Sequence, residues 1–123
     1  MLPVLSPAEA YRRAAFDALV ASGDARQLTS LCLAEAAGSV ALAMLWHERG
    51  EASRRAAALT RALFCLHALQ RGVDRSRPLG EALLIVYRDL AARISGALCR
   101  YDAEQVRDAQ RDLREIDRAF AAA

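Results

Sequence analysis

The chain has 123 residues and a formal net charge of +2 at pH 7, which predicts a single domain with one hydrophobic core. Alanine makes up nearly a quarter of the residues, whereas valine and isoleucine are sparse, so the composition favours helices and argues against a large sheet. All 17 basic residues are arginine, but acidic residues are interleaved with them, and this mixed pattern predicts no nucleic-acid partner.

The first predicted element is a short helix over residues 7–21. Residues 6–9 read Ser-Pro-Ala-Glu, a capping box with proline at the first helical position. We treat residues 1–22 as an N-terminal segment with two possible roles. Tyr11 and Phe16 either anchor it to the rest of the fold or let it act as a removable lid over a partner's binding surface. The segment has no basic start and too short an apolar run for a signal peptide, so a cytoplasmic protein is predicted.

The second predicted helix spans residues 25–48 and ends at Gly50. Between Leu28 and Trp46 its only charged residue is Glu35, and apolar side chains occupy almost every helical angle. A helix packed on one side needs one apolar stripe, so this helix is either surrounded or exposes surplus apolar surface to a partner. We take that surplus as the main indication of function. No membrane span is predicted, because Glu35 lies in the middle of the run and no aromatic belt flanks both ends.

Three further helices follow, over residues 51–71, over residues 79–100, and from a capping box that starts at Asp102 to about Phe120. The longest connector, residues 73–78, is polar. The last helix carries apolar residues on one side and interleaved charges on the other, as a solvated face does. Four long helices with short turns predict an all-α fold, an antiparallel up-down four-helix bundle over residues 23–123 with an additional short N-terminal helix.

The residues that could carry chemistry do not form a recognisable site. Neither His47 nor His67 follows a glutamate by three residues, as carboxylate-bundle metal sites require, and neither has a basic neighbour on its own face that would favour phosphoryl transfer. Three single cysteines inside predicted helices indicate reduced core thiols rather than disulfides. We predict no enzyme, no metal and no cofactor.

From Leu28 onwards the order of motifs resembles the flagellar secretion chaperone FliS family. That pattern has a leucine-rich first long helix, a Gly-Asp/Glu break, a helix of spaced Ala and Leu, a helix with Leu-x-x-Tyr, and an amphipathic last helix. The matching segments here are Leu28 to Ala36, Gly50-Glu51, Ala62 to Leu69, Val73-Asp74, Leu84 to Tyr87, Arg93-Ile94 and Tyr101-Asp102. Tyr11 is similar to the family's N-terminal tyrosine, which covers the binding surface in the free state.

The resemblance implies a cytoplasmic chaperone that binds the C-terminal segment of flagellin in apolar grooves, prevents premature polymerisation and aids export. Recognition of this kind lays an amphipathic helix into a groove as the client folds. The expected partner-binding residues are Tyr11, Phe16, Leu28, Leu31, Leu33, Val40, Met44, Leu66, Tyr87 and Ile94. The alternative is a homo-oligomerising helical scaffold without a flagellin client, in which the apolar helix packs against its copy. A homodimer in the absence of client is therefore also possible.

Overall fold

The computed structural model describes Pro7, Ala10, Ala14 and residues 25–122. This part of the chain contains four helices and no strand: α2 (Ala25–Glu48), α3 (Ala52–Arg71), α4 (Gly80–Cys99) and α5 (Ala103–Ala122). The prediction of an all-α fold is confirmed for these residues, and the predicted helix limits agree with the structure to within about two residues. The additional N-terminal helix, with Tyr11 and Phe16, lies almost wholly outside the described residues.

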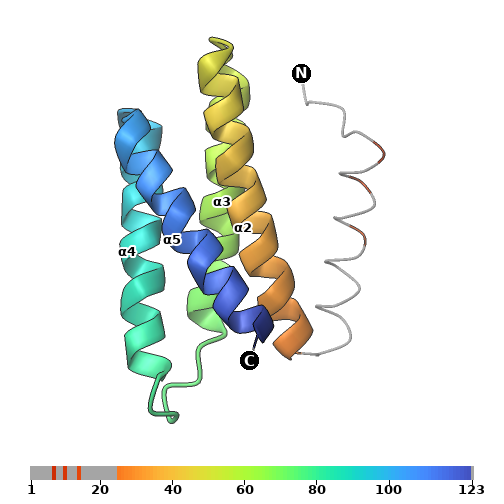
Figure 1. Ribbon diagram of the computed structural model, residues 1–123, viewed down its shortest axis with the longest axis vertical. Helices are drawn as coiled ribbons and strands as arrows, with labels where there is room; N and C mark the ends of the chain where they lie inside the picture. Colours follow the sequence, from red (N-terminus) through yellow and green to blue (C-terminus); the bar gives the residue numbers. More distant parts are fainter. Residues whose placement is uncertain (1–6, 8–9, 11–13, 15–24, 123) are drawn as a thin grey trace.

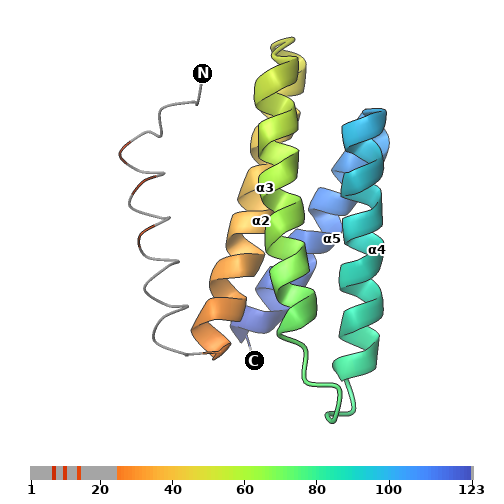
Figure 2. The same ribbon diagram turned by 180° about the vertical axis from the view of Figure 1, so that it is seen from behind.

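The helices form a closed ring of neighbours. In Figures 1 and 2 successive helices run in opposite directions, and α5 crosses obliquely from the upper end of α4 to the start of α2. Each helix packs against two others, α2 against α3 and α5, and α4 against α3 and α5. The guanidinium of Arg26 lies 5.2 Å from the centre of the Phe120 ring, which places the end of α5 beside the first turn of α2.

Two of the helix ends follow directly from local sequence. Gly50 has φ +70°, its N–H donates to the carbonyl of His47 (3.1 Å), and the N–H of Glu51 donates to the carbonyl of Trp46 (2.9 Å). This is the left-handed glycine arrangement that commonly ends a helix. The carboxylate of Asp102 accepts hydrogen bonds from the N–H groups of Glu104 (3.0 Å) and Gln105 (3.2 Å). Asp102 therefore caps α5, as the sequence predicted.

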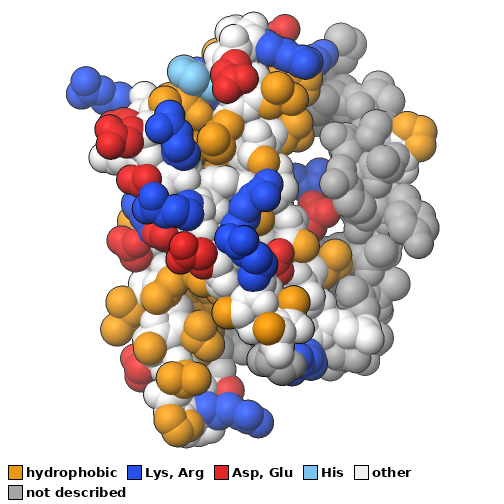
Figure 3. Space-filling model, viewed as in Figure 1, with side chains coloured by type: hydrophobic (Ala, Val, Ile, Leu, Met, Phe, Trp, Pro, Cys, Tyr) orange, Lys and Arg blue, Asp and Glu red, His pale blue; other side chains and the backbone are white. Residues whose placement is uncertain are grey.

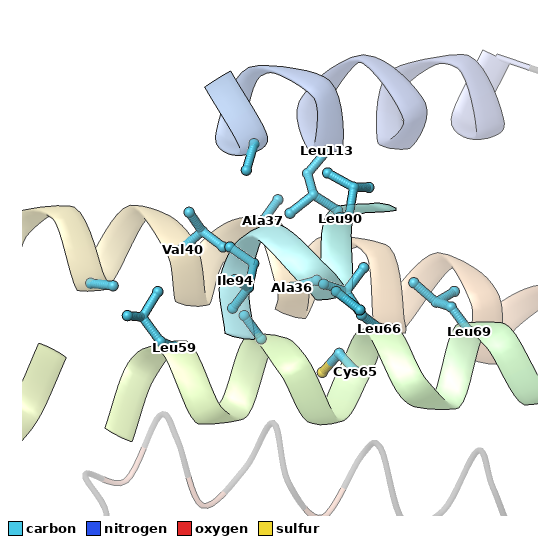
Figure 4. Close-up of a cluster of buried hydrophobic side chains, with 14 of the residues drawn as sticks. Ala36, Ala37, Val40, Leu59, Cys65, Leu66, Leu69, Leu90, Ile94 and Leu113 are labelled. Carbon is cyan, nitrogen blue, oxygen red and sulfur yellow. The ribbon is translucent and has the colours of Figure 1, made fainter. Parts of the chain in front are cut away.

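The core draws on all four helices (Figure 4), and α2 supplies a large share of it. Its buried apolar residues are Cys32, Leu33, Ala36, Ala37, Val40 and Ala43. The single charge of the apolar run is also accounted for, because Glu35 forms an ion pair with Arg61 of α3 (3.2 Å) and is 12% exposed. Of the described helices, α2 alone is long and apolar enough to cross a membrane, and a helix packed inside a bundle meets the same criterion.

The burial of α2 corrects one sequence-based expectation. The surplus apolar surface was expected on this helix, but Leu45, at 39%, is its only exposed large hydrophobic residue. The other large side chains of the apolar run are buried or half-buried, because α3 and α5 cover two of its sides. The expectation about the location of the surplus was therefore wrong.

Candidate functional site

The exposed apolar surface of the described residues is concentrated at the start of α4. Seven large hydrophobic residues of this part of the chain are exposed, and four of them lie within residues 79–86. These four are Leu79 (72% exposed), Leu83 (39%), Ile85 (63%) and Val86 (38%), and we call them the α4 strip. In Figure 3 hydrophobic side chains gather over the lower part of α4. Leu79, Leu83 and Val86 share one side of the helix, and Ile85 points about 100° away from Val86. Exposed apolar patches are typical of interaction sites.

A run of four consecutive apolar residues produces the strip. Residues 83–86 read Leu-Leu-Ile-Val, and successive helical residues point about 100° apart, so they cannot all face the core. Leu84 is 3% exposed and points inward, which leaves its three neighbours outside. No exposed surface was predicted on this helix from the sequence. An unbroken apolar run in a helix that is otherwise amphipathic could have located the site.

The strip is uncovered because α5 leaves α4 at this level. The guanidinium of Arg93 bonds to the carboxylate of Asp112 on α5 (2.7 Å) and to that of Asp89 (3.1 Å). This bridge ties the upper half of α4 to α5. Val86 precedes Arg93 by seven residues, or two turns, and so lies on the same side of α4. Below the bridge α5 diverges towards α2 (Figure 1), and no other described helix covers that side.

An ordered connector presents Leu79 at the end of the strip. The carboxylate of Asp74 accepts bonds from the hydroxyl (2.6 Å) and the N–H (3.0 Å) of Ser76, and the guanidinium of Arg77 lies 3.6 Å away. The hydrogen bonds from Ser76, followed by the charge of Arg77, lower the pKa of Asp74 below its ordinary value. The buried Gly80 is held against this turn, so the connector and the start of α4 form one unit.

The residues predicted to bind a partner occupy two kinds of position. The buried ones are Leu33, Val40, Leu66 and Ile94 at 0% exposure and Tyr87 at 3%. The half-buried ones are Leu28, Leu31 and Met44. The first group meets in one core cluster, and its members touch a partner only if the helices separate. The second group lies along α2, where Leu28 and Met44 pack against that core. Tyr11 and Phe16 lie outside the described residues.

The cysteines and His47 have structural environments. Burial raises the pKa of the Cys65 thiol to about 12, and burial also raises the pKa of Cys32, so neither is a thiolate nucleophile at neutral pH. The ring of His47 stacks on Tyr101 with centroids 3.9 Å apart, and the guanidinium of Arg55 donates to its Nδ1 (2.8 Å). These contacts join the last turn of α2 and the first turn of α3 to the turn before α5. Among the described residues no group of three side chains could hold a metal ion.

The geometry is that of a helical bundle with one helix start left apolar and uncovered. The family model described as flagellar protein FliS matches residues 7–123. The chain belongs to the FliS family. FliS proteins are cytoplasmic flagellar chaperones, so membership gives this chain a flagellar chaperone role with a protein client. No curated protein matches the chain.

Proposed function

We propose that this FliS-family protein binds the C-terminal segment of flagellin on the α4 strip, keeps it from polymerising prematurely and hands it on for export. The observation that carries the proposal is the concentration of exposed large side chains at the start of one helix in a flagellar chaperone. An amphipathic segment that folds on binding would cover these side chains with its own apolar face.

The size of the strip sets how much it can contribute. Full burial of a large aliphatic side chain stabilises by about 1.5–3 kcal/mol. Scaled by the exposed fractions of the four strip residues, their burial contributes about 3–6 kcal/mol. Ordering a disordered client costs about 2–5 kcal/mol. The strip therefore offsets the ordering cost but leaves little net affinity, so the client must also contact other surfaces of the bundle.

The half-buried residues of α2 are the candidates for those additional contacts. Leu28 and Met44 keep part of their surface accessible while resting on the core, and Leu31 is also half-buried. We retain the sequence-based proposal that Tyr11 and Phe16 cover client-binding surface in the free protein. The fully buried residues of the predicted set then support the bundle on which the client rests.

The test is calorimetry with a peptide of the flagellin C-terminal segment. We expect one-to-one binding with a negative heat-capacity change, because apolar surface is buried. The double variant Leu79→Ser/Ile85→Ser removes the two most exposed strip residues and should weaken binding at least about tenfold. The matched control is Phe64→Ser, which removes an exposed large side chain from α3 and should leave the affinity unchanged.

Two results would contradict the proposal. Absence of heat with the cognate peptide rejects flagellin as the client, and equal weakening by Phe64→Ser rejects the strip as the site. In the scaffold alternative a second copy of the chain would cover the same strip, and analytical sedimentation, which measures the oligomeric state, distinguishes it from the chaperone. A stable dimer without client that Leu79→Ser/Ile85→Ser dissociates would favour the scaffold, whereas a monomer favours the chaperone.

A further inference from the structure

One side of α2 is covered by neither of its described neighbours. Glu35 marks the side of α2 that faces α3 through its ion pair with Arg61. Arg26 marks the side that faces α5 through its contact with Phe120. Glu35 and Arg26 are nine residues apart in the chain, which places them on roughly opposite sides of the helix, about 180° apart. The core lies to one side of the line between them, and we call the opposite side the outer side of α2.

The outer side of α2 carries no charge over about four turns. Its residues are small along the middle and large along the edge next to α3: Ala34, Gly38, Ala41 and Leu45 in the middle, and Leu31 and Leu42 at the edge. An added Cβ at Gly38 would meet nothing within 4 Å, so the middle of this side is open. A helix side that faces water is normally polar, as the outer side of α5 is. An uncharged outer side therefore indicates a surface that another segment covers.

The chain's own N-terminal segment is tied to this side by a short connection. The sequence predicts a helix over residues 7–21, and α2 starts at Ala25, so only residues 22–24 join the two. A connection of this length places consecutive helices side by side and antiparallel. Because α3, α5 and the core occupy the other sides of α2, the outer side is the one that remains for this helix. The covalent link also makes the contact intramolecular, so a weak contact is enough to hold it.

The sequence of the segment supplies an apolar side that suits this contact. Pro7, Ala10 and Ala14 are helical and exposed, and spacings of three and four residues put them on one side of a helix. Phe16 and Leu19 fall on roughly the opposite side of the same helix. Large side chains opposite the exposed residues are the ones that a docked helix buries.

We propose that residues 7–21 pack as a fifth helix, antiparallel to α2, on the outer side of α2, with Phe16 and Leu19 directed towards it near Leu31. A helix of 15 residues is about 22 Å long, so it reaches from the start of α2 to about Gly38. Ala34 and Gly38 let the two helices approach closely, because the side chains at a contact set the interaxial distance. The covalent connection selects this occupant over any separate partner.

This docking leaves the α4 strip free. The strip lies on α4, which packs against α3 and α5 but not against α2. The docking therefore holds or fails independently of flagellin as the client. Its consequence for the client does rest on the proposed function, because Leu31 is a proposed client contact and a client that uses it must displace the segment there.

Amide hydrogen exchange of the full chain, read by mass spectrometry, tests the docking without any client. An isolated helix of this length is marginal in water, so slow exchange in residues 8–21 reports packing against the bundle. We expect exchange there to be at least about tenfold slower than in an unstructured chain. Phe16→Ser/Leu19→Ser removes the apolar side of the segment and should restore rapid exchange in residues 8–21, with α2 to α5 still protected.

Two matched double variants separate docking from folding. Ala34→Lys/Gly38→Lys places two cations under the segment, which itself carries Arg12 and Arg13, and should abolish the protection of residues 8–21. Ala92→Lys/Gly96→Lys is the control on α4 and should keep that protection. Both variants change an exposed alanine and an exposed glycine four residues apart, with open space at each glycine. Lysine is a better helix former than glycine, so the bundle should remain folded in both.

Three outcomes overturn the proposal. Rapid exchange of residues 8–21 in the wild type shows that no docked helix forms. Protection that survives in Ala34→Lys/Gly38→Lys, or that is lost equally in the α4 control, removes the outer side of α2 as the site. Protection that rises with protein concentration, together with a dimer in analytical sedimentation, assigns the outer side to the segment of a second copy instead.

Discussion

Replacement of Gly80 by alanine should destabilise the bundle through one contact. The new Cβ would lie 2.2 Å from the carbonyl oxygen of Asp74, 3.0 Å from its carbonyl carbon and 3.1 Å from the Cα of Arg75. These are backbone atoms, so either the connector or the first turn of α4 must move. Overpacking costs about 1–3 kcal/mol. Alanine recovers at most about 1 kcal/mol through its helix propensity. We expect a net loss of about 1–2 kcal/mol and a Tm lower by at least about 4 °C.

Urea unfolding followed by far-ultraviolet circular dichroism measures this difference, and Gly96→Ala on the same helix is the control. An added Cβ at Gly96 meets nothing within 4 Å, so this variant should gain about 0.5–1 kcal/mol. The two glycine-to-alanine changes should thus have opposite signs. If Gly80→Ala is as stable as the wild type while Gly96→Ala gains stability, the connector does not fix the start of α4 as argued. Displacement of the connector should also weaken flagellin-peptide binding, because Leu79 moves with it.

Three further predictions concern the thiols, the α4–α5 bridge and the N-terminal segment. Cys99 should react rapidly with a thiol reagent and Cys65 only on unfolding, and rapid labelling of every cysteine would contradict this. Because burial raises the pKa of Cys65 from 9.0 to about 12, the unfolded chain loses the thiol proton at lower pH than the folded chain. The free energy of unfolding should therefore fall above about pH 9, and less steeply in Cys65→Ala. A double-mutant cycle on Arg93 and Asp112 should give a coupling of about 0.5–1 kcal/mol, and no coupling would show that the bridge does not fasten α4 to α5. Deletion of residues 1–22 should tighten flagellin-peptide binding and slightly lower Tm, whereas aggregation of the truncated chain would make the segment part of the fold.

Features set by neighbouring residues could be predicted from the sequence. Asp102 caps α5 because its carboxylate reaches N–H groups two and three residues ahead, and Gly50 ends α2 because glycine adopts positive φ without strain. The four long helices could likewise be predicted from composition and periodicity, because both are local properties of the chain. None of these requires knowledge of what lies across the fold.

The location of the exposed apolar surface could not be predicted in the same way. Apolar residues on every face of α2 fit an enclosed helix as well as one that awaits a partner, and only its contacts with α3 and α5 decide between them. Leu33 and Val40 were therefore expected to bind a partner and instead lie in the core. The ion pair between Glu35 and Arg61 could not be predicted either, because a pair between two helices depends on how far one helix is shifted along the other.

The oblique crossing of α5 explains why the α4 strip is exposed. A helix that ran along the whole of α4 would cover Leu83 and Val86, and it would leave α2 with α3 as its only described helical neighbour. Because α5 instead runs from α4 to α2, it encloses the apolar side of α2 and uncovers the start of α4. The apolar surface at the start of α4 therefore depends on the path of one helix. The contact of Arg93 with Asp112 fixes this path near the middle of α5, and that of Arg26 with Phe120 fixes it near the end. These residues matter to binding without touching a client.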